Sequence, residues 1–329
     1  MTMTGYANLS NLLMNVAIVG YSIAMLVYAM EMLTARVVVA KRAPERKPAL
    51  VGAGAAGADD SDEPDTAPAT TGEGPGARSL FLGRAAVVVT VVAWAAHLAQ
   101  IVTRGVAADR WPWGNMYEFT STICFAAVTA FLLILLKQNI RFLGLYLLVP
   151  VVLGLGLNGA LLYKSAGPLV PALDSYWIAI HVTAATVAIG LFAVATVASV
   201  LYLLAERHRG RLARGLPTES AGLIRRLPAP EVLDKLAYRV VAVSFPLWTF
   251  GIVGGAIWAE AAWGRYWGWD PKETWSFIIW VIYAGYLHAR VTAGWRGRRA
   301  AIIAIVAFAA ICVNYFVVNI WIVGLHSYA

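Results

Sequence analysis

The stretch WAEAAWGRYWGWDPKETW, residues 258–275, lies between two long apolar segments and decides how this sequence is interpreted. The chain has 13 tryptophans, and this stretch holds Trp258, Trp263, Trp267, Trp269 and Trp275. Tryptophan is common where helices leave a membrane, but such a belt spreads the rings around the bundle. Here they are clustered, and Gly264 and Gly268 between them allow the backbone to approach a flat ligand closely. We therefore predict an aromatic platform at a membrane surface.

The composition is that of a membrane protein. Of 329 residues, 60% are hydrophobic and 13% are charged, whereas soluble domains carry roughly 25% charged residues. A spanning helix needs about 20 mainly apolar residues, because unpaired backbone groups are very unfavourable in hydrocarbon. We predict an all-α integral membrane protein with about eight transmembrane helices. The expected spans are 9–33, 80–102, 116–136, 142–163, 176–204, 240–259, 273–289 and 300–323.

The segment between the first two spans differs from the rest. It is rich in Ala, Gly, Pro, Thr and Asp and cannot bury enough apolar surface to fold. We therefore divide the chain into a first transmembrane helix (1–35), a disordered cytoplasmic linker (36–79) and a seven-helix domain (80–329) with an external loop at 256–275. Residues 231–239 are expected to form a short interfacial helix before the sixth span.

The basic residues predict the orientation. They cluster after the first span and again at 207–226, and basic loops stay on the cytoplasmic side. Both termini are then expected outside, in a multi-pass protein of the plasma (inner) membrane whose active face is extracytoplasmic. The net charge of +8 is explained in this way, so no nucleic-acid partner is expected. Cys124 and Cys312 stand singly in apolar runs, which indicates no thiol chemistry of the chain itself.

Two of the five histidines are predicted to lie at the depth of the tryptophan-rich stretch. His181 lies one turn inside the fifth span, and His326 follows the eighth. Neutral imidazoles from two helices can hold a haem iron between them, whereas a single intramembrane histidine more often joins helices by a hydrogen bond. Two histidines bracketing an aromatic platform favour haem ligation. His288 is expected near the inner end of the seventh span and His97 in the outer half of the second.

The charged residues of the stretch are expected either to stabilise a helix start or to bind anionic groups. Asp270, Pro271 and Glu273 form the pattern of a helix start, with Asp270 as the N-cap of a capping box. Arg265 and Lys272 are the cations best placed for carboxylates such as haem propionates. An equal alternative for both is that they extend towards lipid phosphates.

The sequence also resembles a known family. Residues 256–275, continuing through 286–290, resemble the WWD signature of haem-handling proteins, and most of all the CcsA/ResC type of the System II cytochrome c maturation pathway. Three shorter matches support this resemblance, at 113–118, 176–182 and 324–328.

The resemblance implies a haem-binding and delivery subunit of a cytochrome c synthase, a haem lyase component, with haem b as its substrate. Haem would be presented at the outer face for thioether attachment to the CxxCH motif of apocytochrome c. A CcsB/ResB-type membrane subunit is the implied partner, and a protein of a thiol-reducing pathway is a further one. Carried over residue by residue, the outer ligands are His181 and His326, and His288 is the transmembrane ligand. The other implied cofactor-binding residues are Trp258, Trp263, Trp267, Trp269, Asp270, Arg265 and His97.

Two alternatives stay open at this point. A haem exporter or chaperone would use the same platform and pass haem to a separate ligase. A b-type electron carrier would need two buried histidine pairs stacked across the bilayer, and the expected histidine depths do not provide them.

Overall fold

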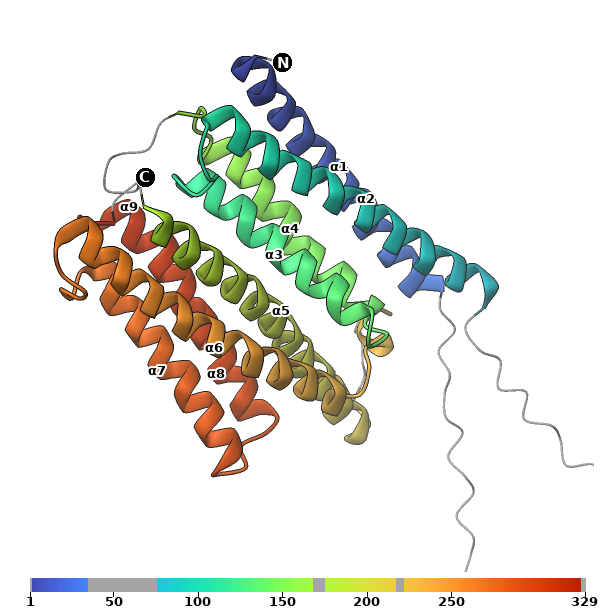
Figure 1. Ribbon diagram of the computed structural model, residues 1–329. Helices are drawn as coiled ribbons and strands as arrows, with labels where there is room; N and C mark the ends of the chain where they lie inside the picture. Colours follow the sequence, from blue (N-terminus) through green and yellow to red (C-terminus); the bar gives the residue numbers. More distant parts are fainter. Residues whose placement is uncertain (1, 35–75, 168–174, 217–221, 327–329) are drawn as a thin grey trace, which may run out of the picture.

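The protein folds as a bundle of long helices (Figure 1). The computed structural model describes residues 2–34, 76–167, 175–216 and 222–326. The helices are α1 (Met3–Thr34), α2 (Ala77–Ala108), α3 (Met116–Leu135), α4 (Arg141–Leu161), α5 (Tyr176–Ala213), α6 (Pro230–Trp263), α7 (Pro271–Val291), α8 (Arg298–Cys312) and α9 (Asn319–Trp321). A 3₁₀ turn, η2 (Ile224–Arg226), precedes α6, and a π-helical segment, η3 (Val313–Val318), joins α8 to α9. The all-α prediction is confirmed.

Seven stretches of the described chain are long and apolar enough to cross a membrane, counting α8 to α9 as one. The remaining long helix, α7, has 21 residues, as α4 does. Its Trp, Tyr and His side chains make it less apolar, so hydropathy alone does not assign it to the membrane. Figure 1 shows that α1 begins and α9 ends at the same end of the bundle, where the α6–α7 loop also lies. Which side of the membrane this end faces stays a prediction.

The structure differs from the predicted helix boundaries at two places. Helix α2 begins at Ala77, inside the predicted linker, while residues 35–75 lie outside the described residues. Residues 231–239 do not form a separate interfacial helix, because α6 runs without a break from Pro230. Its buried stripe continues across the expected boundary through Leu233, Leu236, Ala237, Val240, Val241 and Ser244.

The helices pack as two groups, α1 to α4 and α5 to α9. Helix α1 contacts α2 and α4 in the first group, and α5 contacts α6 and α8 in the second. The contact between α3 and α5 joins the two groups. At this junction Gly190 of α5 lies against α3, since a Cβ there would stand 2.7 Å from the backbone nitrogen of Ala127. Small residues allow such close helix packing in membrane proteins.

A buried ion cluster holds the loop between α2 and α3. Glu118 Oε1 accepts from Arg104 Nε at 3.0 Å, and Glu118 Oε2 accepts from Arg110 Nη1 at 2.8 Å. The backbone N–H of Gly114 donates to the same Glu118 Oε2 at 2.8 Å. Asn115 caps α3 by accepting from the Glu118 N–H at 3.0 Å. By holding this loop, the cluster places Trp113, which precedes Gly114, at the wall of the pocket described next.

Candidate functional site

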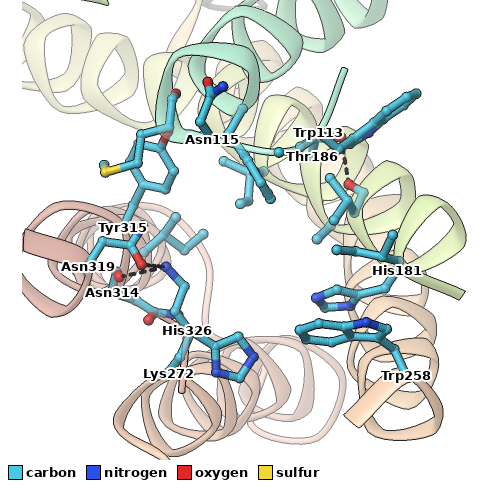
Figure 2. A pocket seen from close by; sticks show the side chains of 18 of the residues that line it. Trp113, Asn115, His181, Thr186, Trp258, Lys272, Asn314, Tyr315, Asn319 and His326 are labelled. Atoms are coloured by element: carbon cyan, nitrogen blue, oxygen red, sulfur yellow. Dashed lines mark hydrogen bonds between the residues drawn. The ribbon is translucent and has the colours of Figure 1, made fainter. Parts of the chain in front are cut away.

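A pocket opens between α3, α5, α6 and the α8–α9 segment, and Figure 2 shows it from close by. It encloses about 120 Å³. Its walls are mainly apolar and include Trp113, Phe119, Ile178, Val182 and Trp258. Its polar side chains are His181, Thr186, Lys272, Asn115, Asn314, Tyr315, Asn319 and His326. The pocket therefore combines an aromatic, apolar surface with two imidazoles and one cation.

His181 of α5 is held by the backbone of α6. Its Nδ1 lies 2.7 Å from the carbonyl oxygen of Gly251. A carbonyl only accepts, so Nδ1 carries the proton and the lone pair is on Nε2. The ring reaches this position because Gly255 lies beneath it, where a Cβ would stand 2.7 Å from the imidazole. The second nitrogen of a histidine anchored in this way is the one that binds a metal.

His326 is held by a carboxylate. Its Nδ1 lies 2.9 Å from Asp270 Oδ2, and the N–H of Leu325 donates to Asp270 Oδ1 at 2.8 Å. Burial lowers the pKa of His326 and outweighs the effect of the carboxylate. Burial alone would raise the pKa of Asp270, but the hydrogen bonds from Leu325 and His326 lower it. A neutral imidazole therefore donates Nδ1–H to an ionised carboxylate, which again puts the lone pair on Nε2.

Trp258 lies between the two histidines. Its ring stacks parallel to His181, with an interplanar angle of 7° and centroids 6.2 Å apart. It meets the His326 ring at a steep angle with centroids 5.6 Å apart, and Trp263 contacts both Trp258 and His326 edge-on. Trp258 is 1% exposed. The structure thus brings together His181, His326, Trp258 and Trp263.

The start of α7 carries Asp270 into this arrangement. Glu273 Oε2 accepts from the N–H of Asp270 at 3.0 Å, and Asp270 in turn caps the helix, completing a capping box. The predicted helix start is confirmed. The same carboxylate of Asp270 therefore begins α7 and orients His326.

The predicted single loop at 256–275 is divided in the structure. Helix α6 continues to Trp263, so Trp258 and Trp263 are helical and only residues 264–270 form the loop. Trp267 and Trp269 pack edge-on against each other and do not line the pocket. Trp269 is 64% exposed, and its φ of +58° is unusual for a bulky residue. The platform inside the pocket is therefore smaller than the sequence suggested.

Arg265 is also outside the pocket. Its guanidinium lies 3.6 Å from Glu273 and so close over Gly268 that a Cβ there would overlap it. Glycine is needed at position 268 because the Arg265 side chain packs against the backbone there, and no ligand is required to explain it. Arg265 fixes the loop.

The structure separates the other two candidate ligands, His97 and His288, from the pocket. His97 is fully buried, with Nδ1 3.3 Å from Tyr21 Oη and Nε2 3.0 Å from Ser121 Oγ, so it joins α1, α2 and α3. His288 lies near the far end of α7 and is exposed. The two histidines therefore have different surroundings, one enclosed and one on the bundle surface.

Several pocket residues were missed by the sequence reasoning. Asn314, Tyr315 and Asn319 lie on and beside η3, whose wider turn interrupts the last predicted span. Two asparagines inside an apolar span were a usable signal, because polar residues there face the protein interior. Trp113 was seen only as part of a motif, although it lines the pocket.

The sequence is similar to a family of known proteins. The sequence model of the family described as Cytochrome C assembly protein matches residues 113–326. A cytochrome c biogenesis protein CcsA from Gloeobacter violaceus is 34% identical over 275 residues, covering 69% of this chain and 81% of its own length. The CcsA of Parasynechococcus marenigrum is 37% identical over 268 residues, covering 74% and 87%. That of Mesostigma viride is 35% identical over 239 residues, covering 67% and 78%.

The family match spans every element that builds the pocket, from Trp113 to His326. The similarity to these relatives covers about seven tenths of this chain and more than four fifths of each relative. The chain belongs to the cytochrome c assembly protein family, as a CcsA-type membrane protein that acts in cytochrome c biogenesis.

Proposed function

We propose that this protein binds haem b in the pocket and presents it at the extracytoplasmic face of the plasma membrane for attachment to apocytochrome c. It would act as the haem-binding subunit of a System II cytochrome c synthase. One observation carries the proposal. His181 and His326 flank one buried tryptophan. Each ring donates its Nδ1 proton to an acceptor, so its lone pair is on Nε2, the nitrogen that would bind iron.

The chain's part in the reaction is positioning. In attachment, each thiol S–H of the CxxCH motif adds across a haem vinyl group: sulfur bonds to one vinyl carbon and hydrogen to the other. Haem and the cysteines supply the reacting groups. The protein's histidines would fix the iron, and the apolar walls would orient the ring and exclude water. Holding two partners in a productive geometry can by itself supply a large acceleration.

The size of the pocket adds a requirement. Its 120 Å³ is less than the roughly 300–1,000 Å³ typical of small-molecule sites. Haem therefore requires the walls to separate. Trp113 lies in the loop before α3, and His326 follows α9 in a non-helical segment. Neither residue is helical, but the Glu118 cluster holds the loop of Trp113 and Asp270 holds His326, so separating the walls must break or displace these contacts.

His288 fits a second, transmembrane position in the same proposal. An exposed stripe on α7 includes Phe277, Val281, Gly285 and His288. A ligand opposite His288 would come from another subunit packed against this stripe, which is the role we propose for a CcsB/ResB-type partner. A haem held there would lie between the two subunits.

The ligand assignment is tested in the purified complex with its partner. We expect a bis-histidine haem spectrum that His181→Ala and His326→Ala each alter, because each removes one axial ligand. His208→Ala, in the last turns of α5 and outside the pocket, is the control and should leave the spectrum unchanged. Unchanged spectra in both pocket variants would contradict the assignment.

A second function, passing haem to a separate ligase, would use the same pocket. The lining residues are equally compatible with this function, because haem and the apocytochrome cysteines supply the reacting groups in attachment. Co-expression with the CcsB/ResB-type partner and a reporter apocytochrome, in a strain without its own pathway, distinguishes the two. Holocytochrome made by the pair indicates a synthase. Haem-loaded protein without holocytochrome indicates a carrier.

A further inference from the structure

Among the described residues that line the pocket, Lys272 is the one with a cationic side chain. It is the second residue of α7, and Figure 2 shows its side chain directed between Asn314 and His326. Its Nζ donates to the backbone carbonyl oxygen of Asn314 at 3.4 Å and to Asn319 Oδ1. The Tyr315 ring centroid lies 5.8 Å from the same atom.

This ammonium group has no carboxylate partner within the described chain. No Asp or Glu oxygen of those residues lies within 4.0 Å of Nζ. The two nearest acids in sequence are used elsewhere: Asp270 accepts from His326 and Leu325, and Glu273 accepts from the backbone of the loop. A charge withdrawn from water without a counter-ion is unfavourable, so the arrangement favours an incoming anion.

Building on the proposed function, we propose that Lys272 binds a haem propionate and thereby sets the orientation of the porphyrin. An ammonium group has three N–H donors. Two are directed to Asn314 and Asn319, and the third is available for a carboxylate oxygen in the pocket. A charge-assisted hydrogen bond of this kind is stronger than a neutral one.

The orientation follows from the asymmetry of the pocket. Lys272 and Trp113 lie on opposite sides of it in Figure 2. Trp113 packs in an apolar cluster with Ile178 and Phe119, and the nearby polar lining residues, Asn115 and Thr186, are uncharged. Propionates at Lys272 direct the vinyl edge of the ring to this apolar cluster. Trp113 and Ile178 also line a second cavity of about 820 Å³ between α2 and α5, so thiols would meet the vinyl edge from that side.

The experiment compares two ligands that differ only in the carboxylates. The full chain in complex with its partner is titrated with haem and with haem dimethyl ester, whose propionates carry no charge. We expect wild-type protein to prefer haem by about 10- to 100-fold, as for one hydrogen bond to a charged group. Lys272→Gln should lose this preference and Lys272→Arg should keep it. Arg265→Gln removes a nearby cation outside the pocket and should also keep the preference.

The outcomes separate the inference from the function on which it rests. Equal affinity of wild-type protein for both ligands overturns the inference and leaves haem binding intact. Equal weakening of both ligands by Lys272→Gln also overturns it, since Lys272 would then only support η3. If wild-type protein binds neither ligand, the proposed function fails as well. Thermal unfolding of each variant without ligand shows whether the fold is retained.

Discussion

Asp270 links three features of the site with one carboxylate. It caps α7, accepts the Leu325 N–H and accepts Nδ1–H of His326. The first role could be predicted from the local pattern of Asp, Pro and Glu. The other two could not, because they depend on contacts with residues 55 and 56 positions later in the chain.

These roles can be separated by substitution. Asn at position 270 keeps a good N-cap but loses the negative charge that orients and polarises His326. We expect Asp270→Asn to weaken haem binding by about 10- to 100-fold with little change in thermal stability. Asp270→Ala should weaken binding similarly and also lose about 1 kcal/mol of stability with the cap. Haem titration and thermal unfolding measure the two effects, and wild-type affinity in Asp270→Asn would contradict this account.

At the scale of helices, the glycine face of α6 determines how α5 meets it. Gly251 and Gly255 allow α5 to approach closely, and the approach brings His181 to the Gly251 carbonyl. The sequence showed a histidine and several nearby glycines, but not that they face each other. That pairing depends on the rotation of two helices about their axes, which apolarity on all sides leaves undetermined.

A methyl group at position 255 should disturb this contact. It would overlap the His181 ring and displace it from Gly251, because the imidazole is the part free to move. We expect Gly255→Ala to lower haem affinity by about tenfold or more while the bundle stays folded. Gly156→Ala on α4 is the matched control, because no atom lies within 4 Å of a Cβ there and the residue does not line the pocket. Similar haem titrations for both variants would refute the contact's role.

Across the whole molecule, hydropathy predicted the number and order of the helices well. It failed where a helix is interrupted or extended without a change in apolarity. Helix α6 continues through a predicted boundary, and η3 widens the last span at Asn314 and Tyr315. One wall of the pocket forms at η3, where Asn314 and Tyr315 line it, because π-helical turns alter the direction of side chains. The apolar spans therefore predicted that His181 and His326 lie at one depth, but they left the wall formed by Asn314, Tyr315 and Asn319 unidentified.

The arrangement also predicts two haem positions far apart. Lys272 and His288 are 16 residues apart on α7, or about 24 Å along the helix. In the complex, we expect His288→Ala to remove about one haem equivalent while the signal altered by His181→Ala remains. Haem quantification together with absorption spectra of single and double variants measures this. Loss of all haem in His288→Ala would mean that the two positions are coupled or are one.

The Asp270–His326 contact also sets the time at which the site can exist during synthesis. His326 leaves the ribosome 145 residues after His181 (326 − 181 = 145), when α6, α7 and α8 have already been made. A nascent chain that has inserted only α1 to α5 holds His181, one of the two proposed iron ligands, and lacks both Trp258 and His326. It cannot capture haem between two ligands. Under the proposed ligation, haem loading would be restricted to chains that have been translated through the last helix.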